Sequence, residues 1–339
     1  MSMSGRASMR NISRPITTPL GSLEADDALA NSPSATRLAS NPVLPKSTRY
    51  VPTGTIANTP FRASFISWAL GGLFWTSLLG GVGALCLRQG WLVEVTIKDV
   101  FGDARWTRCL RPQLGFYLAS WSLFHILEFW TTAACNVEKL SVDAFLLNNG
   151  VQYHAAHIIG LLEYFITAFL IDENAATSSD LILFRRWWMG YGSLMIALPL
   201  VCAGQALRSL AMIHAADSFS HVVSRTTDKQ EGHVLVTWGV YRISRHPSYT
   251  GFFYWALATQ MLLGNVVSFV GFWLVLSRFF KFRIIDEEIH LVRYFGDAYI
   301  NFRKRTGHWL PVNTTYAAPK PRHTVPGTAS HTENGQKTQ

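Results

Sequence analysis

Several apolar segments in this chain are long enough to cross a lipid bilayer as α-helices. A helix needs about 20 mostly apolar residues to span a hydrocarbon layer of roughly 30 Å. The segments that reach this length are Ala63–Leu87, Gln113–Cys135, Val151–Ile171 and Trp187–Leu210. The first is interrupted by Gly and small polar residues, which membrane helices tolerate and which allow close packing between helices. The sequence therefore predicts an all-α, polytopic membrane protein.

Two shorter apolar segments, Tyr249–Leu263 and Val266–Ser277, follow nearer the C-terminus and are separated by the turn dipeptide Gly264-Asn265. Each is short for a full crossing. We interpret the pair as a tight helical hairpin that either spans the bilayer thinly, with a tilt, or re-enters on the same side. In both cases the two ends of the hairpin emerge on one face. With this hairpin the chain has about six transmembrane segments.

The composition agrees with a membrane protein. Only 15% of the residues are charged, whereas roughly 25% is usual in soluble domains. The chain also contains 12 Trp and 21 Phe, and aromatic residues collect at membrane interfaces. The net charge of +9 is spread over the tails and the ends of the apolar segments. This distribution favours contact with anionic lipid headgroups over binding of nucleic acid.

Both tails are expected to be disordered. Residues 1–60 are rich in Ser, Thr, Asn, Ala and Pro and contain no apolar stretch of the kind found in signal peptides. Such a segment buries too little apolar surface to offset the entropy lost on folding. The expected organisation is a disordered tail (1–60), transmembrane helices with their loops (61–220), a region built around the hairpin (221–312) and a second disordered tail (313–339).

An even number of crossings places both tails on the same side of the membrane. The tendency of basic loops to stay inside puts the tails and the loop His221–Ser244 in the cytosol. This loop is long and polar, so it is where a water-soluble ligand could be held. The loop Arg88–Arg111 opposes the assignment, because its five basic residues would then face the lumen.

A basic cluster, Arg245-His246, precedes Pro247 at the start of the hairpin. Proline disfavours helix in the residue before it and suits the first position of a helix, so His246 is expected just outside the helix. The free backbone N–H groups and the positive end of the helix dipole then favour an anionic group there. The alternative interpretation is a belt of basic side chains at the membrane edge.

An acidic cluster, Asp286-Glu287-Glu288, follows the hairpin. Its carboxylates could accept hydrogen bonds from ribose hydroxyls or an amino group, although such a triplet is also typical of a solvated helix face. Arg283 lies four residues before Glu287, which is the spacing of a local ion pair. Its guanidinium could instead bind a substrate carboxylate with two parallel hydrogen bonds. The hairpin geometry brings this cluster close to Arg245 and His246.

No metal is expected. His154 and His157 are spaced by three residues, but no acidic partner recurs at matching spacing, which favours polar contacts between packed helices over a metal site. The same holds for the remaining histidines of the apolar part, His125, His214 and His221. The four cysteines show no paired spacing and are interpreted as reduced thiols; they are Cys86, Cys109, Cys135 and Cys202.

Several ordered motifs between Phe124 and Pro311 resemble the isoprenylcysteine carboxyl methyltransferases. In the C-terminal half they are Leu235-Val236-Thr237-x-Gly239-Val240-Tyr241, Arg245-His246-Pro247-Ser248-Tyr249-x-Gly251, Arg278-Phe279-Phe280, Glu287-Glu288-Ile289 and Phe295-Gly296-x-x-Tyr299. The upstream motifs are Phe124-His125-x-x-Glu128 and Leu140-Ser141-x-Asp143-x-Phe145-Leu146-Leu147-Asn148. The N-terminal tail lies outside the resemblance.

The resemblance implies a membrane-embedded enzyme that uses S-adenosylmethionine to methylate the C-terminal carboxylate of a prenylated cysteine, farnesyl or geranylgeranyl. Arg283 matches the substrate-binding arginine of the family, and Arg245 is a candidate to help it orient the carboxylate. The positions that match the methyl-donor contacts of the family are His233, Val234, Leu235, Val236, Tyr241, His246, Pro247, Ser248, Tyr249 and Glu287. Ser224 aligns with a Gln that contacts the donor in relatives, so this position departs from the pattern.

The resemblance also implies partners and a location. The substrates would be processed CaaX proteins, such as small GTPases or lipidated peptide pheromones, and the enzyme would lie in the endoplasmic reticulum membrane with its active site and both termini in the cytosol. The region 221–312 would then be the catalytic, donor-binding part. A phospholipid methyltransferase, a sterol reductase with a similar Arg-His-Pro-x-Tyr pattern and a non-catalytic membrane protein are the alternatives.

Overall fold

The computed structural model describes residues 58–89, 105–170, 188, 191–219 and 234–314. Every regular element in this part of the chain is helical, so the prediction of an all-α protein is confirmed. The expected disorder of the two tails concerns residues outside the described ranges, apart from 58–60 and 313–314.

Six long helices correspond to the six apolar segments expected from the sequence. They are α3 (Pro60–Arg88), α5 (Pro112–Cys135), α6 (Val151–Leu170), α8 (Tyr191–Ala215), α9 (Pro247–Leu263) and α10 (Val266–Phe295), followed by the short α11 (Asp297–Arg305). Short 3-10 helices lie between them, η1 (Arg105–Cys109), η2 (Val137–Lys139), η3 (Val142–Phe145), η4 (Ala216–Ser218) and η5 (Gly239–Arg242).

The largest difference from the expected bounds is the length of α10. The apolar pattern predicts a helix that ends near Ser277, whereas α10 continues through the acidic cluster to Phe295. Between Ser277 and Gly296 the helix contains no Gly or Pro, and Gly296, with a positive φ of 56°, ends it. Hydrophobicity marks where a helix leaves the apolar layer, while helix-breaking residues mark where it stops.

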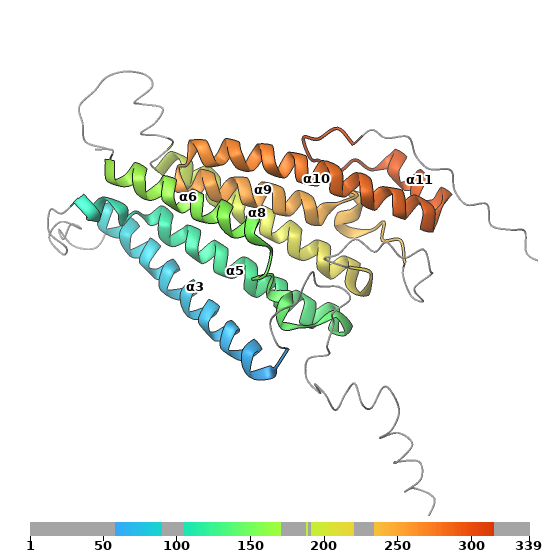
Figure 1. Cartoon of the computed structure of the whole chain (residues 1–339), viewed down its shortest axis with the longest axis horizontal. Coiled ribbons are helices and arrows are strands. Elements are labelled where there is room, and N and C mark those ends of the chain that lie inside the picture. The colour runs from blue at the N-terminus through green and yellow to red at the C-terminus, as the bar shows by residue number, and fades with distance from the viewer. Residues whose placement is uncertain (1–57, 90–104, 171–187, 189–190, 220–233, 315–339) are drawn as a thin grey trace, which may run out of the picture.

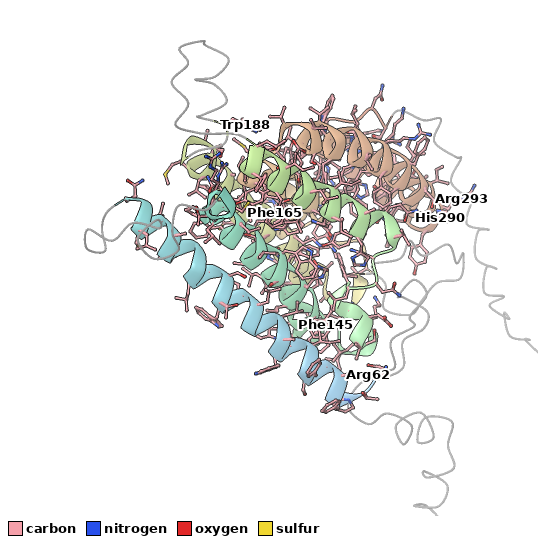
Figure 2. All side chains as sticks on the ribbon, turned by 60° about the vertical axis from the view of Figure 1, so that its left-hand side comes forward. Arg62, Phe145, Phe165, Trp188, His290 and Arg293 are labelled. Atoms are coloured by element: carbon pink, nitrogen blue, oxygen red, sulfur yellow. The ribbon has the colours of Figure 1, made fainter. Side chains whose placement is uncertain are left out.

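Three of the described helices are long and apolar enough by themselves to cross a membrane, namely Pro60–Leu87, Val151–Leu170 and Gly192–Ser218. Large apolar side chains on the outer faces of the bundle are exposed, as expected where a helix faces lipid; on α3 they include Phe61, Phe65, Trp68, Trp75 and Leu79. Figure 2 shows Arg62, His290 and Arg293 toward one end of the bundle and Trp188 toward the other.

The long helices form one bundle in which consecutive helices alternate in direction (Figure 1). Helix α3 packs on α5, α5 on α8, α8 on α9, and α9 on α10. Because the directions alternate, the starts of α3, α6 and α9 lie at the same end of the bundle as the ends of α5, α8 and α10. The segments before α9 and after α10 therefore meet at one end.

The turn between α9 and α10 is held by side chains of α6. Gly264 ends α9 with a φ of 75°, which favours glycine. Asn265 Nδ2 donates to the Gly160 carbonyl at 2.8 Å, and the Glu163 carboxylate accepts from the backbone N of Val267 and Ser268 at 2.9 and 2.6 Å. The turn thus lies level with Glu163. At 1.5 Å per residue, this is about 10 Å along the axis before the end of α6. The position of the turn supports a membrane hairpin that is shorter than the neighbouring helices.

Helices α8 and α9 approach closely at two glycines. A Cβ on Gly204 would lie 2.8 Å from the backbone N of Trp255, and a Cβ on Gly251 would lie 2.7 Å from the backbone N of Arg208. The absence of side chains at these two positions allows backbone contact between the helices. This contact sets Arg208 beside the first turn of α9.

We expect Gly251→Ala to lower the free energy of unfolding by about 1–3 kcal/mol, because the added methyl forces α8 and α9 apart. Thermal unfolding in detergent measures this as a lower Tm. Gly271→Ala is the matched control, since a Cβ there meets no atom within 4 Å, and its Tm should equal that of the wild type or exceed it slightly. Equal Tm values for the two variants would contradict the close contact.

Candidate active site

The candidate site is built at the start of α9. His246 is the residue immediately before the helix, with φ −124° and ψ 61°, and Pro247 occupies the first helical turn. This is the position that the sequence predicts. The His246 side chain is buried, and its ring is parallel to that of Tyr249, with centroids 5.5 Å apart and an interplanar angle of 5°.

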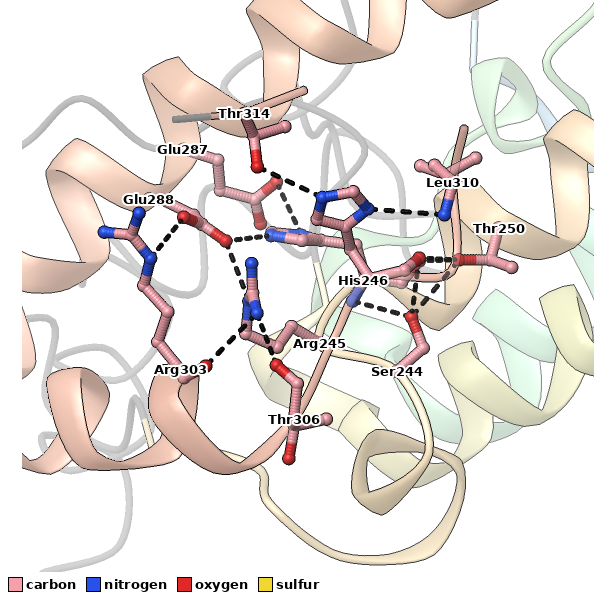
Figure 3. Close-up of polar contacts among 11 residues, drawn as sticks. Ser244, Arg245, His246, Thr250, Glu287, Glu288, Arg303, Thr306, Leu310 and Thr314 are labelled. Carbon is pink, nitrogen blue, oxygen red and sulfur yellow. Dashed lines mark hydrogen bonds and ion pairs between the residues drawn. The ribbon is translucent and has the colours of Figure 1, made fainter. Parts of the chain in front are cut away.

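The buried carboxylate of Glu288 gathers the surrounding cations (Figure 3). Arg245 Nε donates to Oε1 at 2.9 Å, and His246 Nε2 lies 3.3 Å from the same oxygen. Arg303 Nε, from α11, lies 3.3 Å from Oε2. The prediction that the hairpin brings Arg245 and His246 close to the acidic cluster is therefore confirmed.

The surroundings keep the Glu288 carboxylate ionised. Burial raises the pKa of this carboxyl, but the hydrogen bond from His246 and the charges of His246, Arg245 and Arg303 outweigh burial and lower the pKa to about 2. An ionised buried carboxylate needs such partners, because an unpaired charge in an apolar interior is strongly unfavourable.

The Arg245 guanidinium donates to other groups of the protein itself. Besides Glu288, its Nη1 donates to the backbone carbonyls of Thr306 and Arg303, and its own backbone N donates to the Gly307 carbonyl at 2.8 Å. These contacts do not support the expectation that Arg245 orients a substrate carboxylate directly. They support a role in positioning, since one side chain joins the entry to α9, the acidic cluster and the end of α11.

Glu287 offers an oxygen without a hydrogen bond. Its Oε2 is buried and accepts none from the described residues. His246 Nδ1 lies 3.6 Å away, beyond hydrogen-bond distance. Most buried acceptors in folded proteins have a hydrogen-bond partner, so this oxygen can take a donor from a bound molecule. Glu287 Oε2 can therefore accept a hydrogen bond from a hydroxyl or an amino group of a bound molecule.

Arg283, on α10, lies beside Tyr249 of α9. Its Nε donates to the Tyr249 hydroxyl at 3.0 Å, and the guanidinium carbon lies 5.4 Å from the centre of the Tyr249 ring. The stacked rings of His246 and Tyr249 thus lie beside both the acidic cluster and Arg283. A site that holds both a hydrogen-bonding ligand and a carboxylate can be built along this row.

The remaining predicted residues are distributed over two segments. Pro247 and Ser248 are buried in the first turn of α9. Leu235 and Tyr241 pack against Val292, Tyr299 and Phe302 of α10 and α11. Val236 is half-buried and Val234 is exposed, while Ser224 and His233 lie outside the described residues. The segment after residue 233 thus contacts the same helices that carry the acidic cluster.

One functional contact was missed by the sequence analysis. Arg208 on α8 binds Glu128 on α5 with two hydrogen bonds of 2.6 and 2.9 Å, and its Nη1 donates to Ser248 at 2.7 Å. All three side chains are buried. An arginine within an apolar span was a usable signal, because a charge at that depth requires a partner.

The buried histidines between α5 and α6 make packing contacts. His125 lies 2.6 Å from the Phe145 carbonyl through Nδ1 and 3.0 Å from the Tyr153 hydroxyl through Nε2. His157 Nδ1 lies 2.8 Å from the Tyr117 hydroxyl. These contacts support the interpretation that the histidines join packed helices, and within the described residues no three metal-ligating side chains converge.

The sequence and the structure are similar to proteins of one family. A profile of the isoprenylcysteine carboxyl methyltransferase family matches residues 195–293. The protein-S-isoprenylcysteine O-methyltransferase of Schizosaccharomyces pombe is 44% identical over 202 residues, which cover 59% of this chain and 84% of that protein. The Homo sapiens protein of the same name is 36% identical over 211 residues, covering 62% of this chain and 67% of that protein.

A solved structure is similar along most of its length. The structure of a eukaryotic intramembrane Ras methyltransferase, an isoprenylcysteine carboxyl methyltransferase, is 27% identical to this chain with a TM-score of 0.55. The match covers 76% of this chain and 85% of that one.

Acid should weaken the site through Glu288. The folded pKa of about 2 lies below the reference value of 4.5, so the ion pairs stabilise the protein fully above about pH 4.5 and lose this contribution as the pH falls toward 2. We expect Tm in detergent to fall between about pH 4.5 and about pH 2, and Glu288→Gln to start lower and to depend less on pH. Asp297→Asn, at an exposed carboxylate, is the control and should keep the wild-type pH dependence. If the Tm of Glu288→Gln depended on pH as steeply as that of the wild type, Glu288 would not be the source of the pH dependence.

Proposed function

The chain belongs to the isoprenylcysteine carboxyl methyltransferase family and is a multi-pass membrane enzyme that methylates prenylated cysteine, and we propose that the residues around the start of α9 hold its methyl donor and its substrate carboxylate. The observation that carries this proposal is the row formed by Glu287, His246, Tyr249 and Arg283. The family membership excludes the phospholipid methyltransferase, the sterol reductase and the non-catalytic protein as descriptions of this chain.

S-adenosylmethionine, the donor that the family implies, supplies an electrophilic methyl group on a sulfonium. The residues fit this group, because the unsatisfied Glu287 Oε2 can accept from a ribose hydroxyl or an amino group. His246 and Tyr249 flank this position with parallel aromatic faces. The other donor contacts that we propose are Ser224, His233, Val234, Leu235, Val236, Tyr241, Pro247 and Ser248.

Arg283 is proposed to bind the α-carboxylate of the prenylated cysteine. A C-terminal carboxyl has a pKa near roughly 3.5, so it is ionised at neutral pH and needs no general base. What the protein must supply is orientation and exclusion of water. The planar guanidinium can hold both carboxylate oxygens, and its bond to Tyr249 fixes its direction. Near-attack positioning of this kind can contribute several kcal/mol to lowering the barrier.

The apolar surroundings should favour the transfer. A carboxylate and a cationic donor partly neutralise each other as the methyl group moves between them. A site from which water is excluded therefore disfavours the charged reactants more than the transition state. The aromatic side chains Phe280 and Phe252 support this environment, because Phe280 packs beside Tyr249 and Phe252 packs on Phe280.

Arg245 is proposed as a positioning residue. Its contacts with Glu288 and with the carbonyls after α11 hold His246 at the start of α9. Arg208 plays the same part on the other side, since it fixes Ser248 against α5 and α8. The two arginines thus hold the first turn of α9, Arg245 toward α10 and α11 and Arg208 toward α5 and α8.

The substrates are proposed to be processed CaaX proteins, such as small GTPases or lipidated peptide pheromones, whose prenyl chain stays in the bilayer. The enzyme is proposed to cross the endoplasmic reticulum membrane about six times, with both termini and the site in the cytosol. The alternating directions of the helices support this topology, because they bring the segments around α9 and the end of α10 to one end of the bundle.

One assay tests the reaction and its substrate class. Membranes containing the full chain are incubated with methyl-labelled S-adenosylmethionine and either a farnesylcysteine analogue or the same analogue without the prenyl group. Base-labile label on the prenylated analogue alone is the expected result. Label on phospholipid instead, or equal label on both analogues, would contradict the proposal.

Arg283→Ala is expected to raise the KM for the farnesylcysteine analogue by about tenfold or more, because a charge-assisted contact to the carboxylate is lost. Arg283→Lys should restore only part of the loss, since an ammonium lacks the planar fork. Arg293→Ala removes an exposed arginine from the same helix and should leave KM unchanged. Wild-type kinetics of Arg283→Ala in detergent would remove this residue from the mechanism.

Glu287→Ala is expected to weaken donor binding by about tenfold or more while leaving the KM for the prenylated analogue nearly unchanged, because it removes the acceptor for the ribose or amino group. Calorimetric titration of the purified protein with S-adenosylmethionine measures the Kd. Asp286→Ala is the control, since this carboxylate lies 3.8 Å from His290 on the outer side of the helix. Equal affinity in Glu287→Ala and wild type would refute the role.

A further inference from the structure

A shallow groove lies on the outer face of α10, away from the active site. Its volume is about 300 Å³, and it runs between the middle of α10 and the segment that follows α11. Arg278, Lys281 and Phe282 line one side, and Pro311, Val312 and Asn313 line the other. The lining is mostly apolar, with two cations on the helix side.

The two cations are available for a ligand. Arg278 and Lys281 are exposed, and the Arg278 guanidinium lies 5.0 Å from the centre of the Phe282 ring, which holds it at the edge of the groove. The acidic groups farther along α10 pair elsewhere in the described chain, Asp286 with a histidine one turn later and Glu288 with the cations of the site. The groove therefore carries a local positive charge.

The groove lies where the lipid-facing surface of α10 ends. Toward the start of the helix, Val267, Leu274 and Val275 are 76%, 56% and 65% exposed, as befits a surface in contact with acyl chains. The first charge after this surface is Arg278. Two residues before the opposite wall begins at Pro311, Trp309 is 65% exposed, and tryptophan collects at the level of the headgroups. Both sides thus place the groove at the boundary between hydrocarbon and headgroups.

The groove is separate from the catalytic row. Lys281 and Arg283 are two positions apart, so their side chains point about 200° apart around a helix of 3.6 residues per turn. Arg283 faces Tyr249 of α9, whereas Lys281 faces outward. A ligand in the groove would not touch the substrate carboxylate.

We propose that this groove binds an anionic glycerophospholipid of the cytosolic leaflet. The phosphate lies between Arg278 and Lys281, and the glycerol and first acyl carbons lie against Phe282, Pro311 and Val312. A net anionic lipid is preferred over phosphatidylcholine, because the choline cation would meet two further positive charges. The bound lipid holds the second half of α10 at a fixed depth, and that half carries Arg283 and Glu287.

Native mass spectrometry of the purified full chain tests the site directly. Delipidated protein in detergent is titrated with phosphatidylserine or with phosphatidylcholine, and bound lipid is counted. We expect wild type to bind phosphatidylserine better, and Arg278→Gln/Lys281→Gln to bind it roughly tenfold more weakly, as two basic contacts are lost. Lys304→Gln/Arg305→Gln is the matched control, because it removes two exposed cations from α11 and should keep wild-type binding.

Three results would overturn the proposal. If the Arg278/Lys281 variant bound phosphatidylserine like the wild type, the groove would be excluded as the lipid site. An equal loss of binding in the control would show a general effect of basic charge. Soluble glycerophosphoserine distinguishes a lipid site from a phosphate site, and displacement of the lipid by it at equal concentration would contradict a lipid ligand. Because binding is counted without turnover, the outcome is independent of the catalytic assignment.

Discussion

The arrangement of the active site depends on the buried carboxylate of Glu288. It lies on α10 with no exposed surface. Arg245 and His246, directly before α9, and Arg303 of α11 approach it from two separate parts of the chain. Breaking a buried ion pair by removing one partner typically costs about 3–5 kcal/mol. Because these partners belong to the entry to α9 and to α11, this one carboxylate on α10 fixes the three segments relative to one another.

A second buried ion pair holds the other side of the same turn. Arg208 and Glu128 join α8 to α5, and Arg208 also reaches Ser248 in the first turn of α9. In an apolar bundle each charge has few partners available, so such pairs tolerate little displacement. Between them the two ionic contacts set the position of His246 and Tyr249, whose rings lie beside Glu287 and Arg283. Rigid placement of this kind is what methyl transfer between two bound molecules requires.

Local patterns account for much of the fold. The apolar segments located the helices, since lipid-facing and core residues are both apolar in a membrane bundle. Pro247 located the start of α9 and set His246 just outside it. The extension of α10 beyond Ser277 was not apparent, because a polar helix after an apolar one lacks a hydrophobic signal. Arg208 was passed over for a related reason, as its partner Glu128 lies in a helix far away in the sequence.

Read alone, the sequence determined the all-helical membrane architecture, the hairpin and the residue types that meet beside it, because hydrophobic length, turn residues and proline act over short distances. The tertiary structure decided the division of work between the two arginines. Arg245 and Arg283 are the same residue type near the same cluster, yet packing turns the first onto Glu288 and the second onto Tyr249. The direction of a long side chain depends on which partners the neighbouring helices bring within reach, and no local pattern contains that information.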